Sequence, residues 1–383
     1  MNKITRKSFL KVLAATMVGG AAASALTGAA APVSIDETNG KVSRWVKNSL
    51  NPDGPLTIAK QGMFSSGGTV TAPVAGTYDA TTNWLDTTRA GNTAHVDHAN
   101  VLYQIPADSN GWPMVYLHGY GQSRMGWMTT PDGRQGWADL FLRNGYSAFL
   151  VDQPRRGEAG STAQMSTDGF LDTWSADSKD YKPGDQAWYT HFRIGRVAPE
   201  RYEGSQFPEG DAAQNQFFRQ MTPNTGDFDQ AVAAAALDEV MKDVQTLTGH
   251  KSIFVTHSQG GAVGWDVPAD NIAAIVAIEP GGTPAIGSEQ YTKLLSASIP
   301  IAIYFGDYID NGPEDIMSTS FWRQVRDGAL AFAAQYNADG GDCTVVDLPK
   351  IGITGNSHFM FQELNNKEIA DHIYQWLESR ALA

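Results

Sequence analysis

Cysteine is almost absent from this chain of 383 residues, which contains only Cys343. A single cysteine cannot form an intramolecular disulfide, and it excludes a zinc site built from several thiolates. Cys343 opens an apolar run, where a free thiol is expected to act as a small apolar side chain. The fold therefore depends on a packed core rather than on internal disulfides.

Clusters of other metal ligands are also lacking. His95 and His98 stand close together, but no further group of ligand residues follows them in the sequence. A structural role at the end of a strand is therefore expected for these two histidines. The sequence implies neither a metal ion nor a cofactor.

Positive charge is scarce, because 28 Lys and Arg stand against 41 Asp and Glu and give a formal net charge of −13. This balance excludes a generic nucleic-acid binder, which needs a basic surface to neutralise phosphates. Apolar residues make up 42% of the chain and charged residues 18%. Such a composition can bury a large core, and the length suits one large α/β domain.

The basic residues gather at the N-terminus. Residues 1–11 carry four positive charges and no acidic residue, and small and apolar residues follow as far as position 31. This pattern predicts a secretory signal peptide over residues 1–31. The segment around Arg6 and Lys7 resembles a twin-arginine export signal with Lys as the second basic residue. An uncleaved membrane anchor is the alternative, but glycines and alanines make the run too weakly apolar for a stable span.

Cleavage of this signal would leave residues 32–383 and change the net charge from −13 to −17, because four positive charges are removed. A protein this acidic is not expected to bind anionic membrane surfaces. We expect an exported protein of the periplasm, the cell envelope or the extracellular space.

From Trp112 onward, short apolar runs alternate with helical periods, which indicates an α/β fold with a mainly parallel sheet and helices on both faces. The strand candidates are residues 114–117, 148–151, 253–256, 275–278, 301–305 and 344–348. Helices are predicted over residues 137–144 and 228–248. Two further helices are predicted, one with Ser320 as its N-cap and one with Asn366 as its N-cap.

Two stretches depart from this alternation. Residues 62–105 predict antiparallel strands that extend the sheet. Residues 157–227 lack clear periodicity, and so long an insertion predicts a lid or a binding element, with a surface insertion or a dimer contact as the alternative. Its aromatic side chains either line a substrate pocket or pack the insertion onto the body. They include Trp188, Tyr189, Phe192 and Phe217.

Ser258 follows the apolar run 253–256 at a sharp turn, and Gly260 and Gly261 come shortly after it. This arrangement is typical of a nucleophile elbow, in which small neighbours permit a strained backbone and expose the serine hydroxyl. Thr256 replaces the first glycine of the G-x-S-x-G pattern. A lone serine of this kind is more often a cap or a turn residue, so the interpretation depends on other segments.

The run 114–117 ends in His118-Gly119-Tyr120-Gly121. In α/β-hydrolases a loop at this place donates a backbone N–H to the oxyanion hole, and the residue after the nucleophile donates a second one. The candidate donors are therefore the backbone amides of Tyr120 and Gln259. Gly121 is the nearest substitute for Tyr120.

His358 lies in a polar loop after the last predicted strand, late enough to complete the order Ser, acid, His. Two carboxylates are candidates for the acid. Asp310 follows the run 301–305, after the strand that usually carries it. Glu279 ends the run 275–278, where desolvation is costly unless the carboxylate is paired with a partner such as an imidazolium. The pattern alone leaves both open.

Five parts of the chain carry a resemblance to a known family: residues 129–138, 145–146, 151–157, 256–261 and 355–358. They resemble a small group of bacterial secreted esterases within the α/β-hydrolase superfamily, from about residue 62 to the C-terminus. The resemblance implies the α/β-hydrolase fold with 157–227 as an insertion after the fourth strand. It also implies Glu279 as the acid, after the sixth strand. Arg155-Arg156 departs from that group, which often has Gly before the Arg.

These features together predict a secreted serine carboxylesterase that hydrolyses a small-molecule ester through an acyl-enzyme on Ser258. His358 is expected to move the proton and Glu279 to orient the imidazole. A lactonase or an amidase is the nearest alternative, because acyl-transfer chemistry is shared. The rival from another class is a non-catalytic envelope binding protein with a hydrolase fold. A homodimer is compatible with each of these hypotheses.

Overall fold

The computed structural model describes residues 54–72, 74–81, 90–160, 162, 185–222 and 224–383. The predicted signal peptide, residues 1–31, lies outside these residues, as do residues 163–184 of the insertion.

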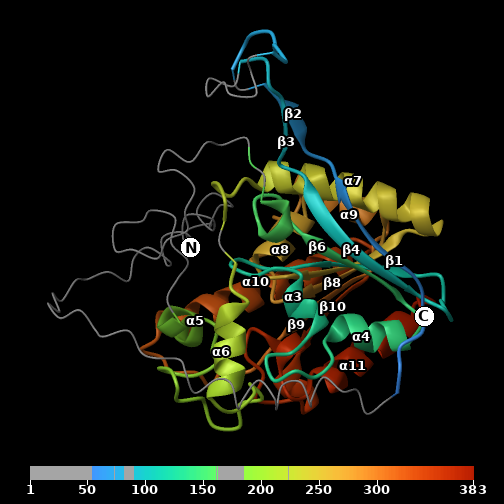
Figure 1. Ribbon diagram of the computed structural model, residues 1–383. Helices are drawn as coiled ribbons and strands as arrows, with labels where there is room; N and C mark the ends of the chain where they lie inside the picture. The colour runs from blue at the N-terminus through green and yellow to red at the C-terminus, as the bar shows by residue number, and fades with distance from the viewer. Residues whose placement is uncertain (1–53, 73, 82–89, 161, 163–184, 223) are drawn as a thin grey trace, which may run out of the picture.

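A mainly parallel sheet of eight strands forms the centre of the molecule (Figure 1). In spatial order its strands are β1 (Ile58–Ser66), β4 (Ala99–Pro106), β6 (Ser147–Asp152), β5 (Pro113–Leu117), β7 (Ser252–His257), β8 (Ile272–Ile278), β9 (Ile301–Phe305) and β10 (Cys343–Asp347). Strand β4 is antiparallel to both of its neighbours, and every pair from β6 to β10 is parallel. The predicted strands are all present, with small differences at their ends.

A second, two-stranded ribbon leads away from the body of the molecule (Figure 1). It consists of β2 (Thr69–Thr71) and β3 (Ala94–Val96), which pair antiparallel. With β1 and β4, this ribbon confirms the antiparallel strands predicted for residues 62–105.

Helices cover both faces of the sheet. One face carries α4 (Trp137–Arg143) and α11 (Asn366–Glu378), which lie side by side in Figure 1. The other face carries α7 (Gln230–Thr248), α8 (Gln259–Gly264), α9 (Glu289–Ser296) and α10 (Met317–Ala338). The shorter elements are α3 (Met125–Met128) and the 3₁₀ turns η3 (Gly157–Ala159), η4 (Ala269–Asn271), η5 (Leu348–Ile351) and η6 (Met360–Gln362). None of the helices in the described part of the chain is long and apolar enough to cross a membrane.

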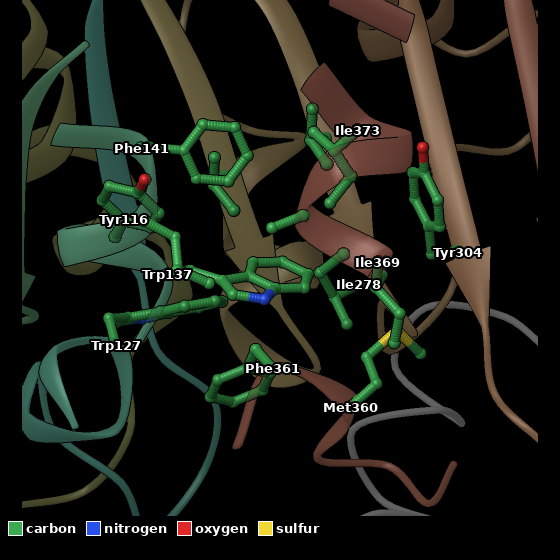
Figure 2. Packing of buried hydrophobic residues seen from close by; sticks show 14 of the residues in the cluster. Tyr116, Trp127, Trp137, Phe141, Ile278, Tyr304, Met360, Phe361, Ile369 and Ile373 are labelled. Atoms are coloured by element: carbon green, nitrogen blue, oxygen red, sulfur yellow. The ribbon is translucent and has the colours of Figure 1, made fainter. Parts of the chain in front are cut away.

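Alternation of side chains along each strand builds two cores, because successive residues point to opposite faces of a sheet. In β5, Tyr116 joins the cluster under α4 and α11, whereas Val115 joins the cluster under α7 and α10. Figure 2 shows the first cluster, in which the rings of Trp127 and Phe361 stack 4.2 Å apart. Apolar runs buried on both faces were therefore a sound basis for predicting these strands.

Helix α7 confirms the helix predicted for residues 228–248, although it begins at Gln230, and both of its ends are capped. The Asp229 carboxylate accepts hydrogen bonds from the backbone N–H groups of Ala231 and Val232, at 3.0 and 3.2 Å. Gly249 ends the helix in a left-handed conformation with φ of 79°. These are the ordinary N-cap and C-terminal signals of a helix.

Two predicted helix caps are wrong. Helix α10 begins at Met317, so Ser320 lies inside its first turn, where the hydroxyl donates to the Met317 carbonyl at 3.0 Å. Asn366 is the first residue of α11 rather than its cap, and its side chain donates to Gln135 O at 2.9 Å. Both side chains form hydrogen bonds with other groups in the folded chain. A sequence pattern for helix caps does not predict these bonds.

The described part of the insertion contains α5 (Asp185–His191) and α6 (Asp211–Arg219). Trp188, Tyr189 and Phe217 are buried in the cluster with α4 and α11, and Phe192 contacts both clusters. Of the two roles expected for these aromatic residues, packing the insertion onto the body is therefore the one that the contacts support. Cys343 is buried as expected, and burial raises the pKa of its thiol to about 12.

Candidate active site

Ser258 lies at the turn between β7 and α8 with a backbone conformation that L-residues rarely adopt, φ 53° and ψ −117°. Its N–H donates to Ile278 O at 3.1 Å, and its carbonyl accepts from Gly261 N at 2.9 Å and Gly281 N at 2.8 Å. With a fourth backbone hydrogen bond, from Ala262 N to the Ser258 carbonyl at 3.3 Å, these contacts hold the strained residue between β7 and β8. Strain that the surroundings hold in this way is typical of a functional residue.

Glycines around Ser258 make the turn sterically feasible. A Cβ atom on Gly260 would lie 2.4 Å from His118 O, and one on Gly261 would lie 2.6 Å from Pro280 Cβ. Gly264 leaves room for Thr256, whose Cγ2 would be 3.1 Å from a Cβ there. Gly264 therefore accommodates Thr256, which replaces the usual first glycine of the motif.

The loop after β10 brings His358 to Glu279. His358 Nδ1 lies 2.6 Å from Glu279 Oε2, and both side chains are almost fully buried. The backbone N–H of His358 donates to Phe192 O at 3.0 Å. On the side toward β7, the rings of His257 and His358 lie 4.3 Å apart, and His257 Nε2 is 3.0 Å from the His358 carbonyl. His257 therefore holds the loop that carries His358.

Glu279, directly after β8, is the carboxylate that the fold joins to His358, and Asp310 is not. The second oxygen of Glu279, Oε1, accepts hydrogen bonds from Gly306 N at 2.7 Å and from Arg193 Nη2. Asp310 is instead exposed and accepts from Arg326 at 2.6 and 2.8 Å. Of the two acid candidates that the sequence pattern left open, only Glu279 contacts the histidine.

Electrostatics favour an ionised Glu279 and a neutral His358. Burial raises the pKa of Glu279, whereas Arg193, His358 and the Gly306 N–H lower it. The lowering effects together are larger, so the pKa lies below its ordinary value. Burial lowers the pKa of His358, against the opposing effect of Glu279. A neutral imidazole that donates from Nδ1 to a carboxylate presents a lone pair on Nε2.

His358 Nε2 is buried and has no hydrogen-bond partner among the residues that the structure describes. It is therefore not bonded to Ser258 Oγ in this conformation. Hydrogen bonds of this kind are often long in unliganded enzymes and shorten when substrate binds. The Nε2 atom thus remains available as a proton acceptor.

The loop after β5 lies against Ser258. The Gly119 carbonyl accepts hydrogen bonds from His118 Nδ1 and from Arg156 Nη1, each at 2.9 Å. Burial lowers the pKa of His118 to about 3, so its ring is neutral. In a trans peptide the C=O and the following N–H point in opposite directions, so these two donors also set the direction of the Tyr120 N–H.

Gln259 begins α8 directly after Ser258, and its side chain is buried. The first N–H groups of a helix have no partner within that helix. The loop that carries the other candidate oxyanion donor, Tyr120, approaches this turn through Gly119, whose added Cβ would lie 2.9 Å from Ser258 Cβ. The sequence separation of the loop and the turn hides this proximity.

Three residues at this site escaped sequence analysis: Arg156, Arg193 and Glu363. Arg156 belongs to the pair that departs from the family pattern, which is a weak signal for it. Arg193 lies in the aperiodic insertion, 86 residues from its partner Glu279, and Glu363 accepts from Ser357 N, next to His358, at 2.9 and 3.1 Å. Nothing in the local pattern marks these two residues.

In the described part of the chain, the histidines and carboxylates near Ser258 do not form a metal site. No group of three or more His, Cys, Asp or Glu residues that could hold a metal ion occurs among the described residues. His95 lies on β3, in the ribbon that leads away from the body.

The sheet order, with its second strand antiparallel and a strained serine after its fifth strand, defines an α/β-hydrolase fold. A solved structure of a bacterial esterase is 31% identical in sequence, covers 87% of this chain and 99% of its own, and superposes with a TM-score of 0.69. The chain belongs to the same family as that bacterial esterase. It is also 26% identical over 314 residues to the probable secreted lipase phiG of a fungus (Fungal sp., strain ATCC 74256), spanning 70% of this chain and 82% of that protein. No family model matches the chain.

Proposed function

We propose that the protein is a serine carboxylesterase that hydrolyses a small-molecule carboxylic ester, with Ser258 as nucleophile, His358 as general base and Glu279 as acid. The observation that carries this proposal is the 2.6 Å contact between His358 Nδ1 and the buried Glu279 carboxylate, beside a strained serine. The family relationship to an esterase and the likeness to a probable secreted lipase support it.

In the proposed mechanism Ser258 Oγ attacks the acyl carbon while His358 Nε2 takes the hydroxyl proton. The backbone N–H groups of Tyr120 and Gln259 stabilise the negative oxygen of the tetrahedral intermediate, a contribution of about 3 kcal/mol for one such donor in other enzymes. Return of the proton from His358 expels the alcohol and leaves an acyl-enzyme. A water molecule, deprotonated by His358, then releases the acid.

Glu279 acts through the imidazole in this scheme. Its carboxylate fixes the tautomer with hydrogen on Nδ1 and stabilises the imidazolium formed in each half-reaction. Because it is fully buried and yet ionised, the attraction to a new positive charge 2.6 Å away is weakly screened. The site needs no cofactor for this chemistry.

Export is the second part of the proposal. We infer that residues 1–31 are cleaved and that residues 32–383 form one exported hydrolase domain with 157–227 as its insertion. The likeness to a probable secreted lipase supports export. Changing Arg6 and Lys7 to Gln is expected to leave active precursor in the cytoplasm. Continued export through the general secretory route would contradict a twin-arginine signal.

A fluorophosphonate probe and a panel of esters with varied acyl and alcohol groups test the proposed function. The wild type should be labelled and should hydrolyse members of the panel, and Ser258→Ala should abolish both. Ser288→Ala is the matched control, because that serine caps α9 through its hydroxyl and should leave labelling unchanged. A folded wild type that is neither labelled nor active would favour the non-catalytic binding protein.

A further inference from the structure

Arg193 is a fully buried cation that the proposed mechanism does not use. Its side chain is 1% exposed, and it lies just after α5 in the insertion. Nη2 donates to Glu279 Oε1, and Nε donates to the Asp307 carbonyl at 2.9 Å. The guanidinium carbon lies 5.3 Å from the centre of the Trp322 ring. A fork of donors thus joins the loops that follow β8 and β9.

The preceding residue, Phe192, contacts the other member of the pair. Its carbonyl accepts the His358 N–H at 3.0 Å, and its ring stacks on the imidazole at 4.8 Å with an angle of 13° between the planes. Two consecutive residues of the insertion therefore hold both Glu279 and His358. A lid that only covered a pocket would not need contacts to these two groups.

Burial makes the Arg193 contact consequential. A carboxylate with no exposed surface is expensive to keep ionised unless several donors compensate it, and removing one partner of a buried pair leaves an uncompensated charge. Glu279 has one oxygen for His358 and one for Arg193 and Gly306 N. Arg193 therefore fixes which oxygen faces the imidazole.

We propose that Arg193 is a positioning residue for the Glu279–His358 pair, and that residues 192–193 of the insertion support this pair in addition to packing on the body. The inference rests on the proposed function. Arg193 does not touch the reacting atoms; it acts through Glu279. The fork geometry of a guanidinium suits this role, because one side chain can bond Glu279 and the Asp307 carbonyl together, whereas an ammonium provides a point charge.

Several charged or titratable groups face the pair. They are Arg193 from the insertion, His257 from the end of β7 and Glu363 after η6. The Asp307 carboxylate, after β9, accepts instead from Tyr308 N and Gly355 N. Arg193 lowers the pKa of both Glu279 and His358. Its removal should raise both pKa values, so both groups would take up protons at higher pH. A protonated His358 cannot accept the Ser258 proton, and a protonated Glu279 cannot stabilise the imidazolium.

The test compares kcat and KM across pH for purified full-length enzyme, wild type and variants. Arg193→Met should move the acid limb of kcat/KM upward by about one pH unit or more. At neutral pH its kcat should fall at least about tenfold, with KM changed less. Arg193→Lys keeps the charge and should leave the acid limb near its wild-type position while lowering kcat. Arg196 lies on the same segment as Arg193 and forms an exposed ion pair with Asp315. Arg196→Met removes only this pair, so its kcat, KM and acid limb should match those of the wild type.

Thermal unfolding separates positioning from folding. A merely structural role for Arg193 would lower the unfolding temperature and the amount of active enzyme without moving the acid limb, and that result would overturn the inference. If Arg193→Met does not fold, Arg193→Lys decides, and a wild-type kcat for it would equally overturn the inference. A wild type that is neither labelled by fluorophosphonate nor active contradicts the proposed function itself, and with it this role of Arg193.

Discussion

Gly119 and Ser258 lie so close together that a Cβ atom on Gly119 would be 2.9 Å from the Cβ of Ser258. The same atom would be 2.9 Å from His257 Nδ1. Contacts this short are essentially never seen, so only glycine lets the loop after β5 approach the serine as it does. Tyr120, whose N–H is the proposed oxyanion donor, directly follows this glycine.

Gly119→Ala should therefore displace the loop or Ser258. We expect kcat/KM to fall about a hundredfold, as when one oxyanion donor is lost, with a slower reaction toward the fluorophosphonate probe. Gly328→Ala is the matched control. That glycine lies in α10 with nothing within 4 Å of its added Cβ, so the change should stabilise the helix by about 0.5–1 kcal/mol and leave kinetics unchanged. Wild-type kinetics for Gly119→Ala would argue against an oxyanion role for this loop.

Arg156→Met should impair catalysis through the same loop. Loss of the 2.9 Å bond to the Gly119 carbonyl frees the peptide that aims the Tyr120 N–H, and we expect kcat to fall by about tenfold or more with a smaller change in KM. Arg155→Met is a demanding control, because it is also a buried arginine but pairs with Asp97. Both variants should lose thermal stability. Equal losses of kcat would show that the kinetic effect comes from destabilisation alone.

Glu279→Gln and Asp310→Asn distinguish the two acid candidates. A triad that loses its acid can lose about ten-thousandfold in turnover, whereas an exposed carboxylate outside the triad matters far less. We expect Glu279→Gln to be the crippled variant, since the amide cannot stabilise the imidazolium, and Asp310→Asn to retain most activity. Kinetics should be measured on protein whose folding is checked by circular dichroism. An inactive Asp310→Asn beside a normal Glu279→Gln would place the acid after β9.

Glu363 should make stability depend on pH. Burial raises its pKa from 4.5 to about 7, although Ser357 and Asn356 donate hydrogen bonds to it. Because this pKa is higher in the folded state, proton binding by Glu363 contributes to stability, and the contribution is fully present below the unfolded-state pKa of 4.5. It disappears as pH rises through the folded-state pKa of about 7. The shift corresponds to about 3 kcal/mol in the free energy of unfolding.

Denaturant unfolding of Glu363→Gln at several pH values tests this effect. The neutral amide should flatten the decline in stability between about pH 5 and pH 8 relative to the wild type. Glu368→Gln is the control, because that carboxyl is exposed on α11 and should leave the wild-type slope unchanged. A parallel slope for Glu363→Gln and wild type would show that Glu363 does not take up the proton.

Local patterns were enough to predict the strands of the parallel sheet, the positions of α4, α7, α10 and α11, and two residues of the candidate site. The strands are apolar runs buried on both faces, and Ser258 and His358 follow strands at places where an α/β-hydrolase carries them. Each of these signals lies within a few neighbouring residues. The caps at Ser320 and Asn366 failed for the opposite reason, since distant or alternative partners took up those side chains.

The sequence by itself therefore determined a mainly parallel α/β fold and the positions at which chemistry could occur, because strand periodicity and turn glycines act locally. The α/β-hydrolase fold was what the resemblance to bacterial secreted esterases implied. The local pattern left open which carboxylate meets His358, and only the resemblance favoured Glu279. The tertiary structure shows the contact, since Glu279 and Asp310 follow neighbouring strands and their side chains bind different partners. It alone also revealed the place of Arg193, whose contact with Glu279 spans 86 residues. A buried charge is satisfied by whichever donors the whole fold brings within reach, and no local pattern records that choice.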